Sequence, residues 1–232
     1  MKKYGITISE ENTKTHIPSF NLLAGAMGAS YAGAIPSSCK AIKACGTCPG
    51  TCPGCYAMKM TRYPAVYTAY ADNTRISTGG AEGLKIMKNA ISEYVRDYEP
   101  RRFRIHDSGD FFNLLYMITW DEIAREFPDT KFYCYTKRVD LLRDFIDLFG
   151  RAPAFTVQLS TWPGILEEET LRELQLDAFP RFEYDDGTRP ELASLPHCPA
   201  VDKNGKRTGI TCNKCKHCAN AKPGEKWAVY AH

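Results

Sequence analysis

The sequence CGTCPGTCPGCYA, at positions 45–57, places four cysteines within eleven residues and separates them mainly by glycine, proline and threonine. A second group of cysteines lies near the other end of the sequence. Thiolates at such short spacing are ligands of zinc or of iron–sulfur clusters, or they form disulfide bonds. The ten cysteines of the chain fall into these two groups and one lone residue: Cys39, Cys45, Cys48, Cys52 and Cys55, then Cys134, then Cys198, Cys212, Cys215 and Cys218.

The disulfide alternative has the least support. Disulfide frameworks belong to short secreted chains, and cysteines two or three residues apart seldom bridge each other. The first residues, MKKYGITISEENTK, lack the apolar stretch of a secretory signal. We therefore expect a cytoplasmic setting, where thiols stay reduced.

A zinc site is a stronger alternative. It normally uses two Cys-x2-Cys pairs separated by roughly 12–20 residues. Only three residues separate Cys48 from Cys52, so one zinc ion is a poor match for the first group, although a zinc ion shared between the two groups remains an alternative.

An iron–sulfur cluster fits the spacing better, because its several iron atoms let a short Gly/Pro loop wrap around it. The second group predicts a closed four-ligand set of Cys198, Cys212, Cys215 and Cys218. The first group has two interpretations. Three thiolates, Cys48, Cys52 and Cys55, leave one iron open, whereas Cys45 or Cys39 as fourth ligand would close the cluster.

The elements that position these cysteines follow an alternating pattern. The sequence predicts a short strand at 4–9 and helices at 64–76 and 80–98, where Leu84, Met87, Ile91 and Val95 share one face. Strands at 102–107, 131–137 and 154–160 then alternate with helices at 113–127, 139–149 and 166–176. This alternation predicts an α/β fold with a parallel sheet. The lone Cys134 falls within a predicted strand and is expected to be a packing residue.

From Phe179 the alternation fades and turn-forming residues dominate. We therefore predict two parts, an α/β domain at 1–179 and an irregular cysteine-rich segment at 180–232. In parallel sheets the ligand site lies beyond the carboxyl ends of the strands. Here those ends read HDSGD (106–110), YTKR (135–138) and LSTWPG (159–164). A mononuclear metal site at His106, Asp107 and Asp110 is disfavoured, because adjacent strand residues point to opposite faces.

Three motifs, CPGCYA, RIHDSGDFF and FYCYTKR, together resemble the radical S-adenosylmethionine (SAM) superfamily, and most closely its short phage-encoded members of poorly defined activity. The similarity covers roughly residues 39–218. Two positions depart from the family pattern. Gly54 replaces the usual aromatic residue before the third cysteine, and the acidic turn is Ser-Gly-Asp rather than Gly-Gly-Glu.

This resemblance implies a partial (β/α) barrel and two clusters, both expected to be [4Fe–4S]. SAM would bind the open iron of the first cluster, and the strand ends would contact SAM through Ser108, Gly109, Asp110, Lys137 and Ser160. The implied reaction is reductive cleavage of SAM to a 5′-deoxyadenosyl radical, with a flavodoxin- or ferredoxin-like electron donor as partner. A phage-encoded protein of this kind would act in the bacterial host cell.

Two other functions remain open at this stage. The first is a non-catalytic iron–sulfur carrier with both clusters fully ligated by cysteine, and the second is a zinc-stabilised binding module. The net charge of +3 gives nucleic-acid binding no support, and no apolar run is long enough to predict a membrane span. Neither the substrate nor the oligomeric state is indicated.

Overall fold

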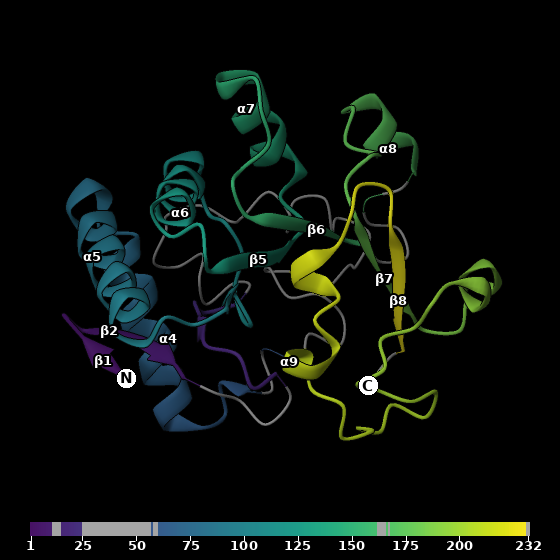
Figure 1. The fold of residues 1–232 in the computed structure, drawn as a ribbon, viewed down its shortest axis with the longest axis horizontal. Coiled ribbons are helices and arrows are strands. Elements are labelled where there is room, and N and C mark those ends of the chain that lie inside the picture. Colours follow the sequence, from purple (N-terminus) through teal and green to yellow (C-terminus); the bar gives the residue numbers. More distant parts are fainter. Residues whose placement is uncertain (11–14, 25–56, 58–59, 162–165, 167, 231–232) are drawn as a thin grey trace.

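The computed structural model describes residues 1–10, 15–24, 57, 60–161, 166 and 168–230 (Figure 1). The five cysteines of the first group and Trp162 lie outside these residues. The described strands form one sheet in the order β1 to β8: β1 (Lys2–Lys3), β2 (Ile6–Ser9), β3 (Ser19–Phe20), β4 (Arg102–Ile105), β5 (Lys131–Thr136), β6 (Thr156–Thr161), β7 (Arg181–Asp185) and β8 (Lys226–Tyr230).

The sheet is mostly parallel, and its spatial order follows the chain. β1 and β2, and β2 and β3, pair antiparallel, whereas every neighbouring pair from β3 to β8 is parallel. Parallel neighbours need crossover connections, and helices supply most of them. The helices are α4 (Pro64–Ser77), α5 (Gly80–Tyr98), α6 (Leu114–Glu126), α7 (Val139–Phe149), α8 (Glu168–Glu173) and α9 (Cys212–Cys215), with 3-10 turns η2 (Pro190–Ser194) and η3 (Cys218–Asn220). The predicted α/β fold with a parallel sheet is confirmed.

Local sequence explains the ends of these helices. The side chain of Asn113 caps α6 by accepting a hydrogen bond from the backbone N–H of Tyr116 at 2.8 Å. Gly150 ends α7 in the left-handed conformation, with φ at 65°. Along α5 the predicted apolar face is buried, as Leu84, Met87, Ile91 and Val95 all lie in the main hydrophobic core.

The two faces of the sheet have different surroundings. The helices α5 to α8 follow one another along one side (Figure 1). On β5, Phe132 and Cys134 join the core on this helical side, and Cys134 is fully buried there, as expected for a packing residue. Tyr133 belongs instead to a small cluster with Ile17 and Ala219, against which Cys212 and Cys218 pack. Cys212 and Cys218 therefore lie over the face of β5 that carries Tyr133.

The expectation that residues 180–232 are irregular is wrong for two segments, because β7 and β8 extend the parallel sheet. In β7 the buried positions include Arg181 and Glu183, which bind other charged side chains, so the strand lacks an apolar alternation. The predicted boundary after residue 179 thus falls between two paired strands, β6 and β7. None of the described helices is long and apolar enough to cross a membrane.

Candidate functional site

The turn after β4 is hydrogen-bonded to the residues that follow β3. The side-chain oxygen of Asn21 accepts hydrogen bonds from the backbone N–H groups of Asp107 (2.6 Å) and Ser108 (3.1 Å). The backbone N–H of Leu22 donates to the carbonyl of Ser108 at 2.9 Å. This contact places Leu22 beside the carboxyl end of β4, and the first cysteine group, from Cys39 onward, lies outside the described residues.

Glycine is required at position 109 for two reasons. Its φ of 91° is one that other residues rarely adopt, and a Cβ added there would lie 2.7 Å from Cβ of Leu22. The turn and the chain after β3 therefore approach more closely than a side chain would allow.

Asp110 links the turn to the next strand. Its Oδ1 accepts hydrogen bonds from the hydroxyl of Thr136 at 2.6 Å and from the backbone N–H of Phe111 at 2.8 Å. Its Oδ2 accepts from the backbone N–H of Lys137 at 3.0 Å. Burial raises the pKa of the Asp110 carboxyl above its usual value, and the hydrogen bonds from Lys137 and Thr136 oppose that shift. Since a carboxylate has about four acceptor directions, about one remains for a ligand, on Oδ2.

The other predicted strand-end residues continue this line of contacts. The ammonium group of Lys137 donates to the hydroxyl of Ser160 at 3.2 Å, so the end of β5 is joined to β6. The hydroxyl of Ser108 is buried and has no hydrogen-bond partner within the described part of the chain. Hydrogen bonds thus link Asp110 to Lys137 and Lys137 to Ser160 across neighbouring strand ends. Ser108 and Gly109 lie in the adjoining turn.

The second cysteine group lies on short C-terminal elements. Thr211 caps α9, which carries Cys212 and Cys215, and the backbone N–H of Cys198 donates to the carbonyl of Ala228 in β8 at 2.7 Å. Cys218 begins η3, which packs on β5 and β6. There the side-chain amide of Gln158 donates to the carbonyl of Cys218 at 2.9 Å.

Three of these thiols influence one another. Burial raises the pKa of Cys218 to about 12, and the nearby thiols of Cys212 and Cys198 contribute to the rise. A hydrogen bond from Tyr135 and the charge of Arg104 act in the opposite direction. The described cysteines form no disulfide bonds. Among the described residues, however, no three Cys, His, Asp or Glu side chains are already arranged to hold a metal ion.

A positive charge lies close to these thiols. The guanidinium of Arg104 lies over the ring of Tyr135, 4.8 Å from its centre, and pairs with Asp107 at 2.6 Å. Anionic thiolates, free or bound to a metal, are stabilised by such a neighbour. This face of the sheet therefore combines cysteine thiols with a neighbouring positive charge, although the described side chains are not arranged around one metal position.

His106 and Asp107 diverge, but strand alternation is not the reason, because β4 ends at Ile105. The left-handed φ of 64° at His106 turns its side chain to the helical side that also holds Ile105. His106 is buried on the helical side against Tyr116, whereas Asp107 pairs with Arg104. With Asp110 bound to Thr136, these three residues form no common metal site. Arg138, at the predicted strand end, donates to Asp140 and to the carbonyl of Phe111.

Sequence reasoning missed several residues of this region. Asn21, Arg104, Tyr135 and Gln158 all contact the turn or the cysteine segment. Arg104 and Tyr135 lie within the motifs RIHDSGDFF and FYCYTKR, but the sequence assigns neither of them a role. Arg104, Tyr135 and Gln158 lie in the strands β4, β5 and β6, where alternation indicates a face of the sheet but no partner, and Asn21 follows β3.

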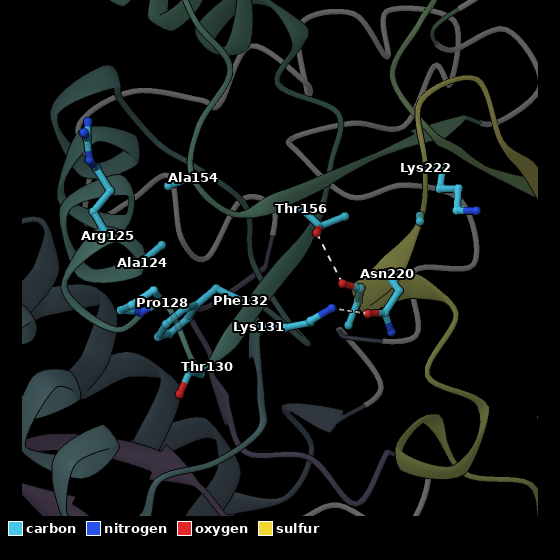
Figure 2. Close-up of a pocket in the computed structure, with 12 residues that line it drawn as sticks. Ala124, Arg125, Pro128, Thr130, Lys131, Phe132, Ala154, Thr156, Asn220 and Lys222 are labelled. Carbon is cyan, nitrogen blue, oxygen red and sulfur yellow. Dashed lines mark hydrogen bonds between the residues drawn. The ribbon is translucent and has the colours of Figure 1, made fainter.

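A separate cavity of about 650 Å³ opens at the amino ends of β5 and β6 (Figure 2). Its charged lining residues are Arg125, Lys131 and Lys222, and Lys131 donates to the side chain of Asn220 at 2.6 Å. The cavity lies at the opposite strand ends from Asp110 and does not coincide with the predicted site.

Comparison with known proteins identifies the family. The chain matches the family described as Gene product 88 over residues 6–221, and it belongs to that family. It is 26% identical to the Gene 88 protein of Mycobacterium phage L5 over 184 residues, which cover 72% of this chain and 74% of that protein. It is 29% identical to the Gene 88 protein of Mycobacterium phage D29 over 90 residues, covering 36% and 38% respectively. No solved structure matches the chain significantly.

Proposed function

We propose that this member of the Gene product 88 family is an iron–sulfur protein of the radical SAM type that acts in the cytoplasm of the phage-infected cell. The observation that carries the proposal is the contact of Leu22 with the Ser108–Asp110 turn. That turn contains Ser108, Gly109 and Asp110, the strand-end residues that the family resemblance implies for SAM. The sheet of sequential parallel strands is, in this proposal, a partial (β/α) barrel.

In this proposal Cys48, Cys52 and Cys55 hold the first cluster, and Cys198, Cys212, Cys215 and Cys218 hold the second. When bound, the first cluster would supply the electron that cleaves SAM into methionine and a 5′-deoxyadenosyl radical. The free acceptor direction of Asp110 suits the ammonium group of SAM, and Lys137 and Ser160 suit its carboxylate and ribose. A flavodoxin- or ferredoxin-like protein would deliver the electron.

The test is to purify the protein anaerobically, count iron and sulfide, and record EPR spectra of the dithionite-reduced protein with and without SAM. Two [4Fe–4S] clusters correspond to about eight irons per chain. We expect a reduced-cluster signal that changes when SAM is added. Cys52→Ala should lose about four irons and the SAM response, and Cys218→Ala should lose about four irons and keep the response.

Cys134→Ala is the matched control, because Cys134 is buried in the helical core and should affect neither iron content nor the SAM response. Full iron content in Cys52→Ala would refute the assignment of the first cluster. Zinc in place of iron would refute the whole proposal and favour a zinc-stabilised module.

A second function is favoured by one specific observation. The Asp110 carboxylate already accepts three hydrogen bonds from the chain, which is the pattern of a structural tie between strands. If Cys45 or Cys39 closes the first cluster, the protein is a non-catalytic iron–sulfur carrier. An EPR signal that SAM leaves unchanged, with about eight irons present, would select this alternative.

A further inference from the structure

Tyr116 and His106 form a closed pair behind the Ser108–Asp110 turn. The Tyr116 hydroxyl and Nε2 of His106 lie 2.6 Å apart, and the two rings stack with an interplanar angle of 21°. Tyr116 is fully buried and His106 is 3% exposed. Phe111 and Trp120 contact both rings, so water has little access to the pair.

The imidazole of His106 is neutral, and its Nε2 faces the Tyr116 hydroxyl. Burial, with a smaller effect from Arg104, lowers the pKa of His106 to about 3, so the ring is neutral near pH 7. Its Nδ1 has no hydrogen-bond partner among the described residues, which leaves the Tyr116 hydroxyl as the one recorded polar partner of the ring. Burial also raises the pKa of Tyr116 well above its usual value, so the phenol keeps its proton until it is oxidised.

The backbone at His106 is strained. Its φ of 64° lies in the left-handed region, where a histidine costs energy that glycine or asparagine would largely avoid. A strained residue next to a candidate site, with an unsatisfied buried nitrogen, points to a role beyond packing.

Aromatic rings connect Tyr116 to the protein surface. Successive ring centres are 6.3 Å apart from Tyr116 to Trp120, 6.0 Å from Trp120 to Phe103 and 6.1 Å from Phe103 to Tyr94. Tyr94 stacks on Tyr98 at 4.8 Å, and Tyr98 is 57% exposed. Tyrosine and tryptophan are the side chains most readily oxidised by one electron without metals or sulfur, and short steps between rings favour electron transfer.

We propose that Tyr116 and His106 are a proton-coupled redox pair that supplies one electron to a carbon-centred radical at the carboxyl ends of β4 and β5. This proposal rests on the proposed function, which supplies that radical. Tyr116 gives one electron to the radical, which takes one proton from water and becomes a closed-shell C–H compound, leaving hydroxide. The phenolic proton of Tyr116 moves to Nε2 of His106, so a neutral tyrosyl radical and an imidazolium remain.

The tyrosyl radical is then reduced through Trp120, Phe103, Tyr94 and Tyr98 by an external one-electron donor, and the proton returns from His106. The pair would thus end a radical reaction that has lost its substrate, before the radical attacks the chain. The short hydrogen bond between Tyr116 and His106 favours this coupled transfer of an electron and a proton.

The experiment oxidises the full-length protein with photogenerated tris(bipyridine)ruthenium(III), using persulfate as quencher, and measures the tyrosyl radical by EPR. We expect a clear tyrosyl signal whose formation is slower in deuterium oxide. Exposed tyrosines such as Tyr4 and Tyr63 are oxidised as well, so the expected change is confined to the deuterium-sensitive part of the signal. Tyr116→Phe should remove that part, and so should His106→Asn, which removes the proton acceptor but tolerates the left-handed backbone.

Tyr133→Phe is the matched control, because Tyr133 is also buried but packs with Ile17 and Ala219 on the other face. It should keep the signal. Circular dichroism and thermal unfolding establish that each variant is folded, and Tyr98→Phe provides a milder second variant that should slow the decay of the signal. A deuterium-sensitive signal that Tyr116→Phe leaves unchanged, or one that His106→Asn leaves unchanged, would overturn the proposal. Absence of iron from the protein would overturn the proposed function and not the Tyr116-dependent signal, so the two failures are distinguishable.

Discussion

The carboxylate of Asp110 accepts a hydrogen bond from the backbone N–H of Lys137 at 3.0 Å, and this bond joins the turn after β4 to the end of β5. The same carboxylate binds the Thr136 hydroxyl, so one acidic side chain organises two neighbouring strand ends. A ligand that reaches the remaining acceptor direction of Asp110 would therefore contact a group that the fold itself holds in place.

Replacing Asp110 with alanine should destabilise the fold. The change leaves the Thr136 hydroxyl and two backbone N–H groups without their acceptor. Relief of the buried charge offsets part of this loss, so we expect the free energy of unfolding to fall by about 2 kcal/mol. Chemical denaturation measures this change in the free energy of unfolding. Asp129→Ala, at an exposed turn, is the control and should change stability by less than about 0.5 kcal/mol. Equal effects of the two substitutions would argue against the structural role of Asp110.

Alanine at position 109 tests the close approach of the turn to Leu22. Gly109 and Gly187 both have positive φ, at 91° and 83°, but only an added Cβ at 109 meets another residue within 4 Å. Gly187→Ala should therefore cost about 1–2 kcal/mol from backbone strain alone. Gly109→Ala should cost about 1–3 kcal/mol more because of the contact with Leu22. Thermal and chemical unfolding of both variants gives the comparison, and a smaller cost at 109 than at 187 would contradict the described turn.

The pair of Glu168 and Arg181 should make stability depend on pH in the acid range. The hydrogen bond and charge of Arg181, with a smaller contribution from Lys226, lower the pKa of Glu168 from 4.5 to about 2, although burial opposes the shift. Because the carboxyl pKa is lower in the folded state, its stabilisation is complete above about pH 4.5 and is lost as the pH falls towards 2.

Substitution of Glu168 with glutamine should remove this dependence. The side chain of Glu168 is about half exposed, so solvent screening limits the loss at pH 7 to about 1 kcal/mol. Urea unfolding at several pH values compares the variant with Glu169→Gln, a change on the same helix that leaves the Arg181 pair intact. If the two variants had the same pH profile, the Glu168–Arg181 bond would not be the cause.

Local patterns were sufficient for the regular part of the fold. The predicted helix at 139–149 coincides with α7, and the strand predicted at 131–137 ends one residue beyond β5. These elements carry apolar residues at clear helical or strand spacing. β7 was not predicted, because its buried residues Arg181 and Glu183 are charged. Their burial depends on ion pairs with Glu168 and Arg189, which a strand pattern cannot reveal.

The site was predictable only in outline. The rule that parallel sheets bind ligands at the carboxyl ends of strands predicts a site at residues 106–110 and Lys137, and the structure shows Asp110 and Lys137 in contact there. The hydrogen bond between Asn21 and the backbone N–H of Asp107 could not be predicted, because 86 residues separate the two along the sequence. The pairing of His106 with Tyr116 depends on a left-handed backbone that sequence patterns do not indicate for histidine.

Tyr135 should tune the cluster that we propose on the C-terminal cysteines. Its hydrogen bond to Cys218 lowers the pKa of that thiol against the effect of burial, which shows that it stabilises negative charge on sulfur. Hydrogen bonds to cluster sulfur atoms stabilise the more negative, reduced form. Tyr135→Phe should therefore shift the reduction potential of this cluster to a more negative value, without loss of iron, in an EPR-monitored redox titration.

Tyr133→Phe serves as the control for this measurement. Tyr133 packs with Ile17 and Ala219 beside the same cysteines, and no hydrogen bond from its hydroxyl to Cys218 contributes to the pKa of that thiol. Loss of the Tyr133 hydroxyl should leave the reduction potential of the cluster near that of the unaltered protein. Because both substitutions remove a single hydroxyl group next to the same sulfur atoms, a shift in Tyr135→Phe alone identifies the hydrogen bond as the cause. Equal shifts in both variants would instead indicate a general change in solvent access to the cluster.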